Sequence, residues 1–251
     1  MVALKYLKRI LLMVGFLTRI PVPFKIDGTE EDYGKGLVFA PVVGLLIGGI
    51  LTILFYILKR FFPPGVTGIL LIAAYIMLTG GLHLDGLGDT FDGIFSNRSR
   101  EKMLEIMRDS RIGTNAVLAV ICVVILNYAL LSSIPLSGLP KALLLFPVAG
   151  RIGSLVGAGS TVYAREGEGL GKSFINCCGI KEILQGGIIY FIVSLLVLNI
   201  KGLLLAAATM ITSFATVKFF AGKVGGATGD ILGAVCELNQ TFFLILFYLF
   251  K

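Results

Sequence analysis

Long stretches without a charged side chain constrain this 251-residue chain more than any other feature. Four stretches are near or above the roughly 17–20 apolar residues that a helix needs to cross a bilayer: 37–58, 61–82, 112–140 and 183–200. Three weaker ones, each with one internal charge, are 142–164, 202–221 and 231–250. Because only 15% of residues are charged, against roughly 25% in soluble domains, the chain is predicted to be an all-α polytopic integral membrane protein.

About seven transmembrane helices are expected, in a single membrane-embedded domain that spans residues 1–251. Residues 1–24 have a basic start and a short apolar run, as a signal peptide does, but they lack a small-residue cleavage site. Arg19, Pro21 and Pro23 end the apolar run early. The N-terminal segment is therefore predicted to be an interfacial or re-entrant helix.

The basic residues fall mainly on one side of the predicted bundle. In a seven-span arrangement, most of the 22 lysine and arginine residues lie in the N-terminal segment and in the loops 84–111, 165–182 and 218–223. Basic loops face the cytoplasm, so we expect a protein of the cytoplasmic (inner) membrane with a cytoplasmic active face and an external C-terminus. The net charge of +7 suits an anionic small-molecule substrate. A nucleic-acid partner is not expected, and a homo-oligomer remains open.

Three acids stand at the end of an uncharged run, in the segment GGLHLDGLGDTFDG at 80–93. On a helix, Asp85, Asp89 and Asp92 share one narrow stripe because they are spaced i, i+4, i+7. Carboxylates crowded in this way repel unless they bind protons or a cation, and Mg²⁺ prefers such oxygen ligands. The stripe predicts a metal site, and the alternative is a solvated helix end. The interspersed glycines would let a phosphate-bearing ligand approach the backbone.

A second polar segment, SREKMLEIMRD at 99–109, has its apolar residues on one side and is predicted to be a surface-lying helix. Arg108 and Arg111 could hold phosphate oxygens through bidentate contacts. Asp109 could be a further metal ligand or a general base. Alternatively, these charges anchor the helix at the lipid headgroups.

Two glycine-rich segments lie on the same predicted face. The segment at 164–173, AREGEGLGKS, lacks the GxxxxGK[ST] spacing of a Walker site, but Arg165 and Lys172 beside flexible glycines suit a diphosphate. The segment at 222–234, GKVGGATGDILGA, leads into the last span through Thr228 and Asp230. Asp230 could complete a metal site or cap a helix.

Polar residues inside the predicted spans are costly unless they are paired or face a polar cavity. Arg151 and Glu237 are candidates for an ion pair with each other. The single histidine, His83, stands two residues before Asp85 and could ligate metal, carry a proton or be structural. The four cysteines show no CxxC spacing and are expected to be packing residues.

These motifs together resemble the cobalamin synthase family, the adenosylcobinamide-GDP ribazoletransferases. The resemblance rests on GGLHLDGLGDTFDGIF and EKMLEIMRDSRIGT, with FLTRIPVP near the start, AREGEGLG in the middle and GGATGDILGA near the end. It runs in order along nearly the whole chain. It implies the last step of cobalamin assembly: the 5′-hydroxyl of α-ribazole, or of its 5′-phosphate, attacks the cobinamide-linked phosphate of adenosylcobinamide-GDP and GMP leaves, with Mg²⁺ required.

Phosphoryl-type transfer needs a metal, cations that hold phosphate oxygens and a base near the attacking hydroxyl. The predicted metal ligands are Asp85, Asp89 and Asp92. The predicted catalytic residues are Asp89, Asp92 and Asp109. The predicted substrate-binding residues are His83, Arg108, Arg111, Arg165, Lys172, Thr228 and Asp230.

Two other functions fit parts of the sequence. Asp89, Asp92 and Gly93 followed by Arg98 are similar to the DxxDGxxAR opening of the CDP-alcohol phosphotransferases, although Arg98 comes one position late and no GxxxDxxxD follows. A CDP-alcohol phosphotransferase or a prenyltransferase-like enzyme is therefore an alternative. An ion-coupled transporter is another, but it predicts acids at mid-membrane and internal repeats.

Overall fold

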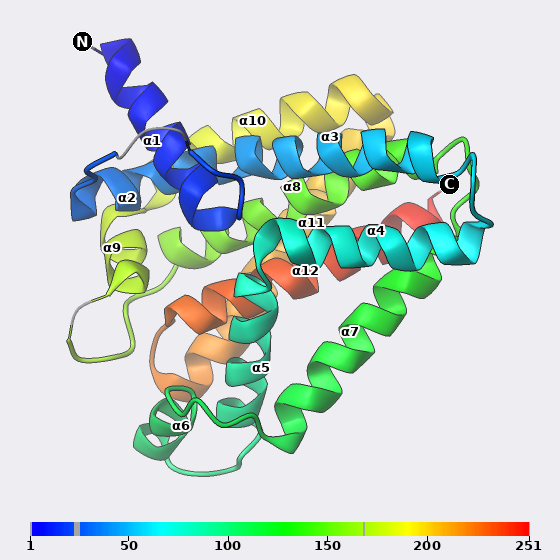
Figure 1. The fold of residues 1–251 in the computed structure, drawn as a ribbon. Coiled ribbons are helices and arrows are strands. Elements are labelled where there is room, and N and C mark those ends of the chain that lie inside the picture. The colour runs from blue at the N-terminus through cyan, green and yellow to red at the C-terminus, as the bar shows by residue number, and fades with distance from the viewer. Residues whose placement is uncertain (1, 23–25, 168, 251) are drawn as a thin grey trace.

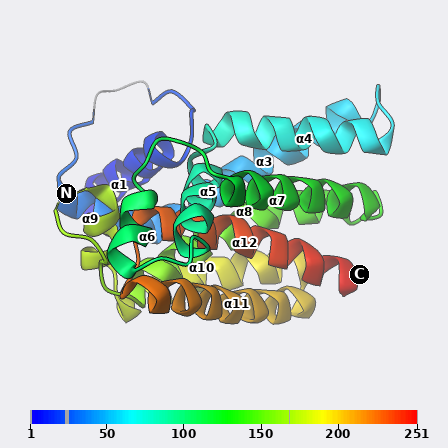
Figure 2. The same cartoon turned by 90° about the horizontal axis from the view of Figure 1, so that it is seen from below.

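Helices form most of the chain. The computed structural model describes residues 2–22, 26–167 and 169–250. Seven helices run beside one another in alternating directions along the chain (Figures 1 and 2). They are α3 (Ala40–Leu58), α4 (Pro64–Thr79), α7 (Thr114–Ser133), α8 (Leu139–Gly159), α10 (Ile180–Leu198), α11 (Ile200–Val224) and α12 (Gly229–Leu249). The predicted all-α polytopic fold is confirmed.

Among the described residues, six segments are long and apolar enough to cross a membrane, with α3 extended by the short helices before it. The seventh candidate is the bent pair formed by α4 and α5 (Leu82–Ile94), which passes the same test when the two helices are taken together. All seven stretches predicted from hydropathy therefore coincide with helices of the bundle. The prediction of about seven spans agrees with this arrangement.

The shorter helices gather at one end of the bundle, which we call the polar end (Figure 2). The C-terminal end of the chain lies at the opposite end, with the loops that join α3 to α4, α7 to α8 and α10 to α11. With an odd number of long helices in alternating directions, the first begins at the polar end and the last ends at the opposite end. The polar end comprises α1 (Val2–Leu17), α2 (Glu30–Gly36), the 3-10 turn η1 (Leu37–Phe39), α5, α6 (Arg100–Ile106), α9 (Leu170–Cys177) and the loops between them.

A sharp turn separates α4 from α5. Gly80 and Gly81 have φ angles of 63° and 71°, in the left-handed region that side chains with a Cβ adopt only at a cost. The axis of α5 consequently lies at 90° to that of α4. The helix that carries the three acids thus runs crosswise to the long helices, at the polar end.

The centre of the bundle is α8, whose side chains are nearly all buried. It contacts α3 and α12 most extensively. Gly44 and Gly48, one turn apart on α3, face the α8 backbone: a Cβ on Gly44 would lie 2.7 Å from the carbonyl oxygen of Pro147, and one on Gly48 would overlap Leu144. Small residues spaced in this way let helix backbones approach closely within a membrane.

A network of polar side chains crosses the buried interior. The Arg151 guanidinium donates from Nη1 to the Tyr75 hydroxyl (3.1 Å) and to Oε1 of Gln240 (2.8 Å). Tyr75 and Gln240 in turn donate to the two carboxylate oxygens of Glu237, at 2.6 and 2.9 Å. The expected Arg151–Glu237 ion pair is therefore wrong in detail: among the described residues, the two charges are joined through Tyr75 and Gln240.

The N-terminal segment forms a helix, as predicted. Leu12, Met13 and Leu17 are buried against the bundle, and Lys8 and the buried Arg9 form ion pairs with Asp32 of α2. These contacts attach α1 to the polar end. That α1 is an interfacial or re-entrant helix stays a prediction.

We predict that Gly48→Ala destabilises the protein by about 1–3 kcal/mol, because the new methyl group would overlap the α8 backbone. Gly49→Ala is the matched control, since no atom lies within 4 Å of a Cβ built at that neighbouring position. Thermal unfolding in detergent should show a lower Tm for Gly48→Ala alone. Equal Tm values for the two variants would contradict the proposed contact.

Candidate functional site

A groove of about 820 Å³ opens at the polar end, between α5, α7 and the segment that joins α6 to α7. It collects residues from three parts of the sequence. The charged side chains that line it are Arg19, Asp85, Asp89, Arg108, Asp109 and Arg111. Five of these six were predicted from the sequence, and the structure brings them together in one groove.

A second charged group lies where α12 begins. The Arg165 guanidinium donates from Nη2 to Oδ2 of Asp230 at 2.6 Å. A short parallel bridge between Tyr163 and Ala227 holds the two loops together. Thr228, not Asp230, caps α12, because its hydroxyl oxygen accepts from the amide of Ile231 at 3.2 Å. The Asp230 carboxylate is thus free of a capping role and forms an ion pair.

The charged residues of the groove and the Arg165–Asp230 pair both lie beside α5. Gly86 packs on the first turn of α12, where an added Cβ would lie 2.9 Å from the carbonyl oxygen of Asp230. Burial, then the nearby carboxylates of Asp85 and Asp230, raise the pKa of Asp89 to about 7, while Arg165 opposes this rise. The structure therefore gathers carboxylates whose mutual repulsion a cation would relieve. The donors are all oxygens, which fits a hard ion such as Mg²⁺.

Asp92 points elsewhere. Its Oδ2 accepts from the Gly113 amide at 2.6 Å, and its Oδ1 accepts from the Ala116 amide at 2.9 Å. Both oxygens thus satisfy amides at the N-terminus of α7, where a negative charge is also favoured by the helix dipole. The structure gives Asp92 a capping role, and its predicted roles as metal ligand and catalytic residue stay predictions.

The glycines of α5 serve packing. Cβ atoms built on Gly86, Gly88 and Gly93 would meet α12, α7 and α6 respectively. In particular, a Cβ on Gly93 would lie 2.8 Å from the carbonyl oxygen of Met103. Gly88 also lines the groove and Gly86 a neighbouring cavity, so the interpretation that these glycines admit a ligand to the backbone stays a prediction.

The arginines of the groove already have partners. Arg111 holds both oxygens of Asp109 in a forked ion pair, with Nη2 2.6 Å from Oδ2. This contact lowers the pKa of Asp109 to about 2, so Asp109 is a poor proton acceptor at neutral pH. Arg108 donates to the backbone carbonyl of Glu166 at 3.2 Å. These residues also link the groove to the loop that carries Arg165.

Sequence analysis missed Arg19 as a groove residue. Its backbone amide donates to the carbonyl of Leu78 at 2.7 Å, and its guanidinium lies against Gly80. The FLTRIPVP motif contained the signal, because it places a cation in a segment otherwise governed by apolar residues and proline. Only the tertiary contact with the Gly80–Gly81 turn brings it to the site.

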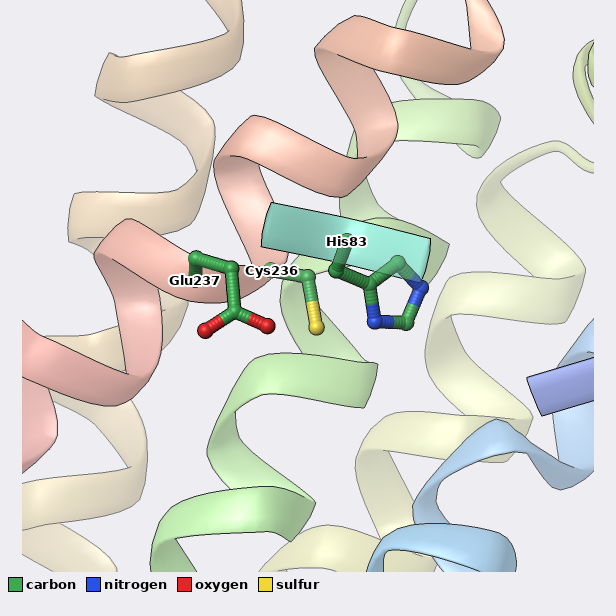
Figure 3. A group of neighbouring side chains, drawn as sticks. All are labelled: His83, Cys236 and Glu237. Atoms are coloured by element: carbon green, nitrogen blue, oxygen red, sulfur yellow. The ribbon is translucent and has the colours of Figure 1, made fainter. Parts of the chain in front are cut away.

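His83 and Lys172 lie outside the groove. Lys172 is half-buried on α9, and His83 is buried beside Cys236 and Glu237, with potential ligand atoms all within 4.8 Å of one another (Figure 3). Both Glu237 oxygens already accept hydrogen bonds from the network that contains Arg151. A cation at this cluster would face the Arg151 charge, so the groove is the better cation site.

Comparison with known proteins gives a consistent result. Residues 9–248 match the family model described as cobalamin-5-phosphate synthase. A Clostridium acetobutylicum protein named adenosylcobinamide-GDP ribazoletransferase is 53% identical over 97% of this chain and 96% of its own length. Proteins of the same name from Alkaliphilus oremlandii (43%; 98% of each chain) and Caldanaerobacter subterraneus (42%; 96% and 98%) are also similar. No solved structure matches.

We predict that Asp92→Ala lowers the free energy of unfolding by about 0.5–2 kcal/mol, the usual cost of losing a helix cap. The substitution removes the two carboxylate oxygens that accept hydrogen bonds from the Gly113 and Ala116 amides. Asp85→Ala, on the same helix, should leave stability unchanged within about 0.5 kcal/mol, and denaturant unfolding in detergent measures both. A cap is excluded if Asp92→Ala is as stable as the wild-type protein.

Proposed function

The chain belongs to the cobalamin-5-phosphate synthase family, and from this premise we propose that it catalyses the reaction for which its relatives are named. It transfers the adenosylcobinamide phosphate moiety of adenosylcobinamide-GDP to α-ribazole or α-ribazole 5′-phosphate, with release of GMP. The observation that carries the proposal is the groove in which Asp85 and Asp89 face Arg108 and Arg111. Such a surface suits a diphosphate that arrives with a divalent cation.

In the proposed site, Asp85 and Asp89 would hold Mg²⁺, and Asp230 would be a further oxygen donor. The ion, when bound, neutralises negative charge on the diphosphate. Arg165, Arg108 and Arg111 hold phosphate oxygens in place, since a guanidinium offers a planar fork of donors. Asp92 positions the loop before α7 through the Gly113 amide. Lys172 lies outside the groove on α9 and Thr228 is buried at the start of α12, and their substrate-binding roles stay predictions.

The reaction is a displacement at phosphorus. A hydroxyl oxygen of the acceptor bonds to the cobinamide-linked phosphorus, its proton is lost, and the bond from that phosphorus to the bridging oxygen of the diphosphate breaks. GMP carries away that oxygen. Because an acceptor with a 5′-phosphate has no free 5′-hydroxyl, the attacking oxygen for that acceptor is another hydroxyl of the ribose. The protein's contribution is then to position two substrates and to balance charge.

We place the polar end at the cytoplasmic face of the cytoplasmic membrane, because the basic loops gather there. A cytoplasmic site also meets soluble nucleotide substrates. The transporter alternative is not favoured: the acids lie at one end of the bundle on a crosswise helix, whereas a transport path needs them at mid-membrane. The CDP-alcohol and prenyltransferase-like alternatives are not favoured either, since the family match covers residues 9–248.

A direct assay tests the activity. Purified protein in detergent receives adenosylcobinamide-GDP, α-ribazole and Mg²⁺, and the products are separated by chromatography. We expect GMP and a cobalamin in equal amounts. Absence of both products, from protein that remains folded, would contradict the proposed function.

We predict that Asp89→Asn reduces kcat/KM at least a hundredfold, about 2.7 kcal/mol of transition-state stabilisation. The change removes one charge from the acid group with almost no change in volume. Asp27→Asn, an exposed acid outside the groove, is the matched control and should remain active. Exhaustive chelation of divalent ions should abolish wild-type turnover, and re-addition of Mg²⁺ should restore it. Activity that survives chelation would contradict the metal assignment.

We predict that Arg165→Lys reduces kcat/KM for adenosylcobinamide-GDP at least tenfold, about 1.4 kcal/mol. Lysine keeps the charge beside Asp230 but loses the planar fork. Arg60→Lys, an exposed position in the segment between α3 and α4, should leave the kinetics unchanged. If Arg165→Lys retains wild-type kcat/KM, Arg165 serves the fold through Asp230 and does not hold phosphate.

A further inference from the structure

A separate cavity of about 160 Å³ lies between α1, α5, α9 and α12. Phe16 and Leu17 line it from α1, Phe174 from α9 and Leu232 from α12. The rings of Phe16 and Phe174 lie 5.1 Å apart between centroids. In another protein, an apolar cavity of about 150 Å³ takes up benzene, so this cavity has room for at least one aromatic ring.

The cavity adjoins the groove. Leu82 and Asp85 line both spaces, so the Asp85 carboxylate stands at the boundary between them. A molecule whose apolar part fills the cavity would present its polar part to the groove at Asp85. This is the arrangement that a two-substrate transfer requires, because the acceptor hydroxyl must meet the donor phosphate.

The cavity wall offers few free polar side chains, namely Asp85 at its boundary with the groove and the ring of His83. None of the described residues that line it is a lysine or arginine. The Ser154 hydroxyl donates to the Leu232 carbonyl at 3.0 Å, and Asp230 is paired with Arg165. A ligand with many hydrogen-bonding groups would lose them on entry, at a cost of about 1–3 kcal/mol for each unsatisfied group.

One polar ring in the wall stands without a partner. His83 is 7% exposed, and its Nδ1 is buried with no hydrogen-bond partner among the described residues. Figure 3 shows one ring nitrogen on the side of Cys236 and the other turned away from Cys236 and Glu237. The nitrogen on the side of Cys236 is bonded to Cγ and is therefore the unpartnered Nδ1, so the outer nitrogen is Nε2. A ligand with a single ring nitrogen would pair with Nε2.

The two substrates of the proposed function carry different bases. Guanine, on the donor, has more donors and acceptors around its ring than Asp85 and His83, the free polar side chains of this wall, can pair. The benzimidazole of α-ribazole is largely apolar and has one free ring nitrogen. The chemistry of the cavity therefore favours the acceptor base.

We propose that this cavity binds the benzimidazole base of the acceptor, with the ribose at Asp85 and the donor diphosphate in the groove. This inference rests on the proposed function. It makes Phe16, Leu17, Leu37, Phe174 and His83 the determinants of acceptor choice, and it assigns them no part in donor binding.

Steady-state kinetics of cavity-filling variants test the proposal. Leu37→Phe and Leu17→Phe add ring volume from two different elements of the wall. We expect each to raise KM for α-ribazole at least tenfold while KM for adenosylcobinamide-GDP stays within twofold. Leu51→Phe, a buried leucine of α3 that does not line the cavity, controls for general packing damage. Unchanged α-ribazole KM in both variants, or a rise confined to the donor KM, would overturn the assignment.

An acceptor series in the wild-type protein covers the case in which the variants do not fold. Ribosides of benzimidazole should be used, and a riboside whose base carries a third fused ring should be rejected. Equal use of both overturns the proposal. Equilibrium dialysis measures the binding of α-ribazole in the absence of the donor. It therefore tests the cavity independently of the proposed transfer reaction. If the protein binds α-ribazole, loses this binding in Leu37→Phe and releases no GMP, the assignment of the cavity stands and the proposed transfer reaction is refuted.

Discussion

The left-handed turn at Gly80 and Gly81 is the constraint on which the site depends. An apolar helix that continued straight from α4 would carry Asp85 and Asp89 along the axis of a span. Two successive residues with positive φ instead direct α5 across the bundle. For residues with a Cβ this backbone costs roughly 1–2 kcal/mol each. The turn places the acids at the polar end, beside Arg19 and the loop that carries Arg111.

The position of α5 is then fixed by close helix contacts and by one carboxylate. Gly86, Gly88 and Gly93 let three neighbouring helices approach its backbone, and Asp92 ties it to the first amides of α7. Deeper in the bundle, Arg151 and Glu237 are held by hydrogen bonds through Tyr75 and Gln240. Because unpaired charges are expensive there, this network keeps α4, α8 and α12 in register beneath the site.

Two arginines at the polar end are paired with carboxylates before substrate enters, and two other carboxylates are not paired. Arg165 is paired with Asp230 and Arg111 with Asp109, while Asp85 and Asp89 have no such cation beside them among the described residues. Under the proposed function, Mg²⁺ and the diphosphate arrive together and add little net charge. The arginines then exchange a carboxylate for phosphate oxygens, and the carboxylates gain the cation. Such an exchange needs positioned side chains and little movement of the backbone.

Hydropathy alone determined the seven apolar helices and the polar end, because the cost of burying a charge in lipid acts on each stretch of sequence by itself. The same local logic placed Asp85, Asp89, Arg108 and Arg111 at one site. Helical spacing could not show that Asp92 turns to α7 or that Arg19 reaches the groove, since both depend on contacts between segments distant along the chain. The Arg165–Asp230 pair and the cavity beside Asp85 likewise exist only after α5, α9 and α12 pack together.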